Sequence, residues 1–273
     1  MCPEGDTIPQ QGVESASWEI PAFRKYEFHS RQHRYCVCVF VINEGERFLA
    51  QLDRMRRVSD RIDIIIADGG SSDDSMEPSH LSNAGVRTLL VKTGPGRLSA
   101  QMRMALAYAM EEGYDGVVVM DGSNKDDPSD VERFIEALDE GYDHVQGSRY
   151  LRGGKGINTP IGRHYGVTLL HAPVISIAAG FRYTDTTNGF RAYGRRFLLD
   201  PRVAPFREIF NNYELHYYLA IRAARLGYRC IEVPVTRTYP RNAETPTKIR
   251  GVRGNILVLR TLLVAATGKW NPK

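Results

Sequence analysis

Short, continuous apolar runs recur in the first half of this chain, and they constrain its fold more than any other feature. Residues 35–42, 62–67 and 117–120 consist almost entirely of valine, isoleucine and other apolar residues. A strand with one face in water alternates apolar and polar residues, whereas a strand of a parallel sheet is covered on both faces and is apolar throughout. The runs therefore predict strands of a buried, mostly parallel sheet.

Amphipathic segments separate these runs. Apolar side chains recur at helical spacing over residues 46–58, 98–110 and 127–138, and the last of these opens with Asp127 and Pro128, a typical N-cap and first-turn pair. Alternating strands and helices predict an α/β, Rossmann-like fold with helices on both faces of the sheet. In such a sheet the ligand binds beyond the carboxyl ends of the strands, where the strand order reverses.

The expected organisation is one domain with an extension at each end. At 273 residues the chain is long enough to bury a full core over residues 34–240. Residues 1–33 are polar and aperiodic, and we expect an arm that is disordered or draped over the domain or a partner, as in an arm-exchanged homodimer. Residues 241–273 combine basic and apolar side chains. This tail is expected either to lie on an anionic membrane or to dock on protein.

Charge and hydropathy exclude several classes of protein. The net charge of +4 and the pI of about 8.8 are too weakly basic to indicate a nucleic-acid partner. The first thirty residues have no signal-peptide pattern, and the most apolar late stretch, residues 256–266, is short and interrupted by Arg260. We therefore expect a cytoplasmic protein with, at most, peripheral contact with the inner face of the plasma membrane.

Polar clusters follow three of the apolar runs, where a ligand site is expected. They are Asn43-Glu44, the segment Asp68-Gly-Gly-Ser-Ser-Asp73, and the segment Asp121-Gly-Ser-Asn-Lys-Asp-Asp127. Each cluster alone is typical of a turn or a helix cap. Together they suit a nucleoside diphosphate, because carboxylates accept hydrogen bonds from ribose and base groups and hold a divalent cation against phosphates.

The ordered set of motifs resembles family 2 glycosyltransferases of the GT-A fold. Within that family the chain is similar to the dolichol-phosphate mannose synthases and the bacterial polyprenyl-phosphate glycosyltransferases. The resemblance spans roughly residues 35–250 and includes, besides the three clusters, Gly147-Ser-Arg149-Tyr150 and Asp185-Thr-Thr-Asn-Gly-Phe-Arg191.

The resemblance implies an inverting transfer of a sugar from a UDP- or GDP-hexose to a polyprenyl phosphate in bacterial surface-polysaccharide or glycolipid assembly. By resemblance, Arg149 and Arg163 hold the acceptor phosphate, and Asp121 and Asp185 complete the catalytic set. The residues expected to bind the nucleotide sugar are Asn43, Glu44, Asp68, Gly70, Asp73, Asp121, Gly122, Arg241 and Lys248.

One element departs from the family pattern, which reads Asp-x-Asp at the metal. Here Ser123 replaces the second aspartate, so the expected Mg²⁺ or Mn²⁺ has Asp121 and a weaker hydroxyl ligand. Two alternatives stay open. Asn124, Asp126 or Asp127 joins Asp121 on the metal, or Lys125 neutralises the diphosphate as a fixed cation.

Two other functions also stay open. If the acceptor is a hydroxyl group, a base has to take its proton, and Asp185 is the best candidate. Asp185 is equally suited to anchoring its own turn. The loss of the second metal aspartate also leaves open a nucleotide-sugar-binding homologue without catalysis.

Overall fold

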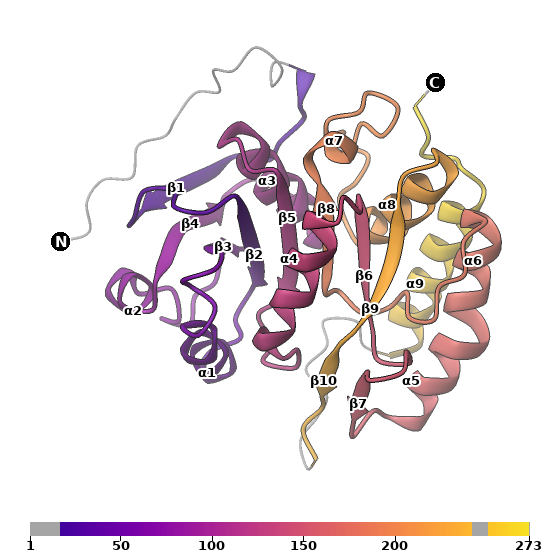
Figure 1. Ribbon diagram of the computed structural model, residues 1–273, viewed down its shortest axis with the longest axis horizontal. Coiled ribbons are helices and arrows are strands. Elements are labelled where there is room, and N and C mark those ends of the chain that lie inside the picture. The colour runs from indigo at the N-terminus through magenta and orange to yellow at the C-terminus, as the bar shows by residue number, and fades with distance from the viewer. Residues whose placement is uncertain (1–16, 242–250, 273) are drawn as a thin grey trace.

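Eight strands form one mixed sheet in the order β1-β4-β3-β2-β5-β8-β6-β9 in the computed structural model (Figure 1). The structure describes residues 17–241 and 251–272, with side chains omitted for 251–256. The strands of this sheet are β1 (Phe23–Glu27), β2 (Tyr35–Val41), β3 (Asp63–Asp68), β4 (Val86–Lys92), β5 (Gly116–Asp121), β6 (His144–Ser148), β8 (Arg191–Gly194) and β9 (Cys230–Pro234).

Strands β4, β3, β2 and β5 are parallel, and β2, β3 and β5 coincide with the three apolar runs that predicted such a sheet. The chain adds β3 and β4 on one side of β2 and then returns to place β5 on the other side, so the strand order reverses at β2. The register aligns Val41 with Asp68 and Phe40 with Asp121. The carboxyl ends of β2, β3 and β5 therefore lie level at one edge.

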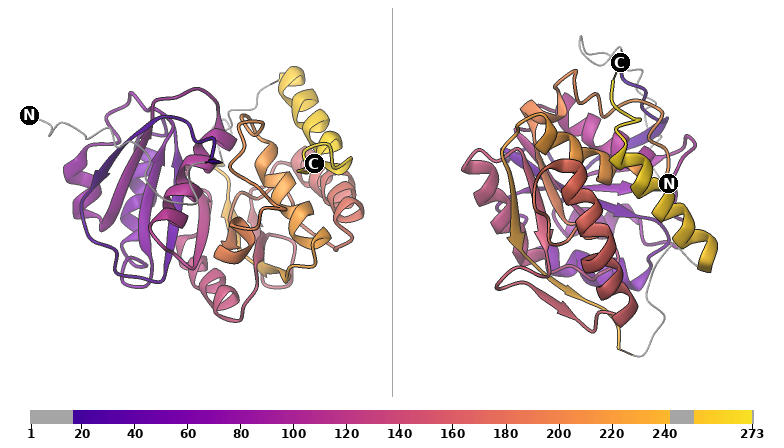
Figure 2. Two further views of the ribbon diagram at one scale, coloured as in Figure 1. Left: turned by 90° about the horizontal axis from the view of Figure 1, so that it is seen from above. Right: turned by 90° about the vertical axis from the view of Figure 1, so that its right-hand side faces the viewer.

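Helices cover both faces of the sheet, which confirms the expected α/β architecture. Cores join the sheet to α1, α2 and α4 on one face and to α3 and α8 on the other, and α6 and α9 pack outside α8 (Figure 2). The helices are α1 (Glu46–Met55), α2 (Pro78–Asn83), α3 (Leu98–Glu111), α4 (Val131–Asp139), α5 (Ile161–Gly166), α6 (Ala172–Ala179), α7 (Arg195–Leu198), α8 (Glu214–Arg225) and α9 (Gly251–Ala266), with a 3₁₀ turn at Pro128–Asp130 and a π-helical segment at Val167–His171.

Strand β8 was not expected from the sequence. It runs antiparallel between β5 and β6 and follows the Asp185–Arg191 motif directly. The strand has only four residues, Arg-Ala-Tyr-Gly, which is too short for a periodic signal. Its position brings the loop before it to the edge of the sheet where β5 ends.

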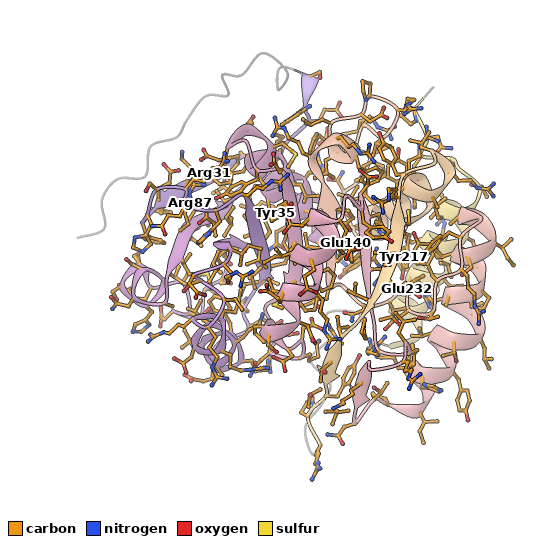
Figure 3. All side chains as sticks on the ribbon, in the orientation of Figure 1. Arg31, Tyr35, Arg87, Glu140, Tyr217 and Glu232 are labelled. Atoms are coloured by element: carbon orange, nitrogen blue, oxygen red, sulfur yellow. The ribbon has the colours of Figure 1, made fainter. Side chains whose placement is uncertain are left out.

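The segment expected to be an arm contributes to the sheet. Strand β1 pairs antiparallel with β4 of the same chain, from Phe23↔Lys92 to Glu27↔Thr88. The next residues are also anchored, because Arg31 donates a hydrogen bond to the carbonyl of Glu112 (2.6 Å) and lies, like Arg87, over the ring of Tyr114. Figure 3 labels the two arginines on this side of the molecule. Residues 23–27 are therefore engaged within their own chain, and a five-residue edge strand has little sequence signal of its own.

The C-terminal helix α9 docks on the protein. Leu262 and Ala265 are buried against α6 and α8.

A separate two-stranded parallel sheet pairs β7 (Lys155–Ile157) with β10 (Thr236–Thr238) and brings the chain near residue 237 back to the β5 edge. Among the described residues, no helix is both long and apolar enough to cross a membrane.

Candidate active site

A cavity of about 610 Å³ opens at the carboxyl ends of β2 and β5, where the strand order reverses and a ligand was expected. Helices α3 and α8 and the loop before β8 close its other sides. Of the predicted site residues, Asn43, Glu44, Asp121, Gly122, Ser123 and Arg163 line this cleft.

The loops after β2 and β3 hold each other in place on one side of the cleft. The backbone N–H of Asn43 donates to Ser71 Oγ (2.9 Å), and its side-chain carbonyl accepts from the N–H of Ser72 (2.8 Å). Asp73 accepts from the N–H of Gly45 (2.8 Å). Asp73 therefore shapes the loop that presents Asn43 and Glu44 to the cleft.

Asp68 is turned into its own loop. Its carboxylate accepts from the N–H groups of Gly70 and Ser71 (both 3.0 Å) and from Ser71 Oγ (2.6 Å), and the residue is buried. Gly70 has φ of +97°, a left-handed conformation that favours glycine. Asp68 and Gly70 form a capped turn at the rim, and Gly69 is the residue of this motif that lines the cleft.

A buried guanidinium bridges two carboxylates on the β5 side. Arg237 Nη2 donates to Asp121 Oδ2 (2.7 Å), and Nη1 donates to Asp126 Oδ2 (2.5 Å). Burial alone raises the pKa of Asp121, but the charges of Arg237 and Lys125 outweigh burial and lower that pKa to about 2. Asp121 is therefore ionised and already paired with a fixed cation.

Helix α1 fixes the turn that follows β5. Gln51 donates to the carbonyl of Asp121 (2.8 Å) and accepts from the N–H of Asn124 (2.6 Å). Arg54 donates to Asn124 Oδ1 and Asp127 Oδ1 (both 3.0 Å). These contacts hold the turn in place and pair Asn124 Oδ1 and Asp127 Oδ1 with Arg54.

Lys125 lies in the same turn and lines the cleft, with 9% of the residue exposed. Burial, and then repulsion by Arg237, lower the pKa of its ammonium group to about 8. The group is therefore mostly protonated at neutral pH. Lys125, Arg163 and Arg237 together give the cleft a cationic wall.

Three buried polar atoms in residues that line the cleft have no hydrogen-bond partner within the described protein. They are Ser123 Oγ, Thr186 Oγ1 and Asn188 Nδ2. Buried polar groups in native proteins are almost always satisfied, and exceptions need an explanation. A polar ligand in the cleft would satisfy all three.

Arg149 and Asp185 pair with each other. Arg149 Nε and Nη2 donate to the two carboxylate oxygens at 2.6 and 2.9 Å, and Nη1 donates to Tyr239 Oη (2.8 Å). Asp185 is fully buried, Arg149 is 3% exposed, and neither lines the cleft. The geometry favours the role of Asp185 as an anchor of its turn. That Arg149 holds an acceptor phosphate, and that Asp185 takes a proton from a hydroxyl acceptor, both stay predictions.

Arg163 extends from α5 to the rim of the cleft, where it lies over the ring of Tyr239 (5.6 Å). It is the expected acceptor-binding residue that does reach the cavity. Arg191 is buried and donates to the carbonyls of Asn188 (3.0 Å) and Thr186 (2.7 Å). It therefore holds the loop that carries two of the unsatisfied polar atoms.

Several cleft residues were not singled out from the sequence. Arg237 gives no motif signal, and Gln101, on the helix α3, donates to the carbonyls of Val41 (3.0 Å) and Ala67 (2.5 Å). In the sequence, the only indication that Gln101 bonds these carbonyls is its position as a polar residue within an apolar helix face. Arg241 is exposed, and Lys248 lies outside the described residues. Other lining residues not predicted are Lys92, Arg97, Tyr213, His216 and Tyr217, the last labelled in Figure 3.

Comparison with known proteins identifies relatives of the chain. The sequence model described as Glycosyl transferase family 2 matches residues 36–206. An undecaprenyl-phosphate mannosyltransferase of Micrococcus luteus is 31% identical over 197 residues, which cover 71% of this chain and 79% of the relative. A polyprenol monophosphomannose synthase of Mycolicibacterium smegmatis is 26% identical over 208 residues, covering 75% and 77%.

Solved structures share the fold at lower identity. Glucosyl-3-phosphoglycerate synthase of Mycobacterium tuberculosis, in complex with Mn²⁺, UDP and glucosyl-3-phosphoglycerate, aligns with a TM-score of 0.62 at 18% identity. The alignment covers 98% of this chain and 89% of that one. The fold is therefore GT-A, as the resemblance implied.

Proposed function

The chain belongs to glycosyl transferase family 2, and from this premise we propose that it transfers a sugar from a nucleotide sugar to a polyprenyl phosphate. The family makes it a glycosyltransferase. The proposed acceptor is supported by two relatives, one named an undecaprenyl-phosphate mannosyltransferase and the other a polyprenol monophosphomannose synthase. The proposed process is the assembly of a surface polysaccharide or glycolipid.

The observation that carries the proposal is the chemistry of the cleft wall. Several cations line one cavity, among them Lys125, Arg163 and Arg237, and Ser123 and Asn188 add unsatisfied polar atoms to it. A reaction between a donor diphosphate and an acceptor phosphate brings several negative charges together. Fixed cations in a partly buried site offset the electrostatic repulsion between the donor and acceptor phosphates.

The proposed reaction needs no strong base. One oxygen of the acceptor phosphate, already ionised at neutral pH, attacks C1 of the donor sugar from the side opposite the leaving group. The new C1–O bond forms as the bond from C1 to the diphosphate breaks, and its electron pair leaves with the nucleoside diphosphate. The configuration at C1 is inverted. Positioning and charge stabilisation carry the rate in such a step.

A hydroxyl acceptor is the less supported alternative. It requires Asp185 to accept a proton. That carboxylate is fully buried, accepts two hydrogen bonds from the Arg149 guanidinium, and is not part of the cleft wall.

For the donor we propose a UDP- or GDP-hexose. Its nucleoside would lie against Asn43 and Glu44, on loops held by Asp68 and Asp73. Its diphosphate would lie beside Asp121. The next residue, Gly122, packs closely against β2, because a Cβ there would meet Val41 Cγ2 at 2.7 Å.

Because structural neighbours hold Mn²⁺, a divalent metal would be expected in this site as well. The residues around Asp121 do not fit a conventional metal site, because Arg237 already pairs with Asp121 and Asp126. Arg54 engages the oxygens of Asn124 and Asp127. Within residues 17–241 and 257–272, no three histidine, cysteine or acidic side chains cluster as metal ligands.

We place the enzyme in the cytoplasm, in peripheral contact with the inner face of the plasma membrane. The support is an apolar surface on α5, the π-helical segment and α6, defined by Ile161, Leu169 and Ile177, which are 76%, 72% and 79% exposed. Arg163 lies in the same stretch and at the cleft. A lipid phosphate entering from a bilayer would meet this apolar surface beside a cation.

A thermal-shift screen with UDP- and GDP-sugars, with and without Mn²⁺, tests the donor site. Binding to the native state raises the melting temperature by mass action. We expect nucleotide sugars of one base to raise it, and adenosine nucleotides to have no effect. If no UDP or GDP compound shifts the melting temperature under either condition, the nucleotide-sugar site is wrong.

A further inference from the structure

We propose that Arg237 and Lys125 neutralise the donor diphosphate in this enzyme, so that sugar transfer proceeds without a divalent metal ion. The inference rests on the proposed function and concerns the same site. The residues that surround Asp121 differ from the family's metal motif.

The first support is the bridge that Arg237 forms. Its guanidinium contacts Asp121 at 2.7 Å and Asp126 at 2.5 Å, and a third contact joins it to Asn188 Oδ1 at 3.2 Å. The positive charge that a metal would bring to Asp121 is therefore supplied by the protein. A divalent cation on Asp121 would also have to lie beside this guanidinium and be repelled by it.

The second support is the residue at position 123. A serine stands where a second carboxylate would complete the metal ligands, and its hydroxyl oxygen is buried without a partner in the described protein. A neutral hydroxyl beside Arg237 and Lys125 is poorly suited to hold a dication. It is well suited to donate a hydrogen bond to a phosphate oxygen.

The third support is the position of Lys125, two residues after Ser123 on the turn that α1 holds rigid. Lys125 and Arg237 line the same cavity from two different segments. Cations that are fixed before the ligand arrives need no reorganisation when charge develops. When the C1–O bond breaks, its electrons move to the diphosphate, and both cations stabilise that added charge.

The test compares nucleotide binding and transfer in EDTA and in Mn²⁺. Isothermal titration calorimetry measures the affinity for UDP, GDP and the corresponding monophosphates. We expect the wild-type protein to prefer one diphosphate over its monophosphate in EDTA, and to transfer sugar in EDTA at a rate similar to that in Mn²⁺. Binding and transfer that vanish in EDTA and return with Mn²⁺ or Mg²⁺ would overturn the inference.

Lys125→Gln is the decisive variant, because Arg237 also holds the buried Asp126 and its removal risks misfolding. Losing one charge-assisted contact should weaken diphosphate binding in EDTA about tenfold and leave monophosphate binding nearly unchanged. Lys155→Gln, which removes an exposed charge outside the cleft, is the matched control and should bind like wild type. Unchanged diphosphate affinity in Lys125→Gln would contradict the role of Lys125. If folded wild-type protein binds no nucleotide in either buffer, the proposed function itself fails.

Discussion

Three buried arginines organise the cleft, each through a different kind of partner. Arg237 bridges two carboxylates, Arg149 pairs with one, and Arg191 donates to backbone carbonyls. A buried guanidinium is tolerated only when its donors are satisfied, and its planar fork then fixes the geometry of its partners. Arg191 and Arg237 both line the cavity that Lys125 and Arg163 line, and of these two Arg237 is the one that holds carboxylates.

Asp185→Asn separates the two roles open to that residue. The substitution leaves the Arg149 guanidinium buried without its counter-charge, which should cost about 3–5 kcal/mol of unfolding free energy. Below the melting transition, we expect turnover of the folded protein with a phosphate acceptor to stay within about tenfold of wild type, since no general base is lost. Urea denaturation and initial rates measure the two effects.

Asp115→Asn is the control for that experiment. Asp115 pairs with Arg34 at 2.5 Å, but both side chains are largely exposed, so the change should cost less than about 1 kcal/mol. A stable Asp185→Asn protein whose rate falls by a factor of about 10² or more would instead identify Asp185 as the base.

Among the elements, the turn after β5 carries charged groups, whereas the helices α5 and α6 carry exposed apolar side chains. The turn is held by Gln51 and Arg54 of α1 and presents charged groups in fixed positions. The α5–α6 stretch presents apolar side chains to solvent and contains a π-helical segment at Val167–His171. Such segments occur often at functional sites.

A vesicle-binding measurement tests the apolar surface. Leu169→Ser combined with Ile177→Ser removes two side chains that would enter the interface of a bilayer, and each such burial is worth about 1.5–3 kcal/mol when complete. We expect the double variant to bind anionic vesicles at least about tenfold more weakly in a sedimentation assay. Its activity on a short-chain, water-soluble polyprenyl phosphate should stay close to that of wild type.

Ile209→Ser changes an exposed isoleucine outside this surface and is the matched control. Equal vesicle binding by the wild type and the double variant would show that this surface does not contact the membrane.

At the scale of the whole molecule, the parallel part of the sheet and the location of the cleft followed from the sequence. Continuous apolar runs identified β2, β3 and β5, and the polar residues after them had to meet at one edge. Asn43, Glu44 and Asp121 do line the cleft there. These predictions depend on local pattern and on the geometry shared by all parallel sheets.

The pairing of side chains across the fold was not predictable in the same way. Arg149 and Asp185 are 36 residues apart, and Arg237 and Asp121 are 116 apart. Nothing local indicates that an arginine between two threonines returns to the end of β5. That contact depends on the pairing of β10 with β7 and on the loop before β8. Strands β1 and β8 were not predicted for the same reason, because they are short and are defined by pairing with distant strands.

Transfer of the sugar to a lipid phosphate is tested by determining the structure of the product. Purified enzyme would be incubated with the nucleotide sugar that binds and with undecaprenyl phosphate, and the extracted lipid examined by mass spectrometry and ³¹P NMR. We predict a sugar–phosphate diester of the lipid and one nucleoside diphosphate released for each sugar transferred. Folded Asp121→Ala protein should give none, because it lacks the carboxylate that positions Arg237. An unchanged lipid phosphate, with the sugar released free or attached to a hydroxyl group, would show that the acceptor is not a lipid phosphate.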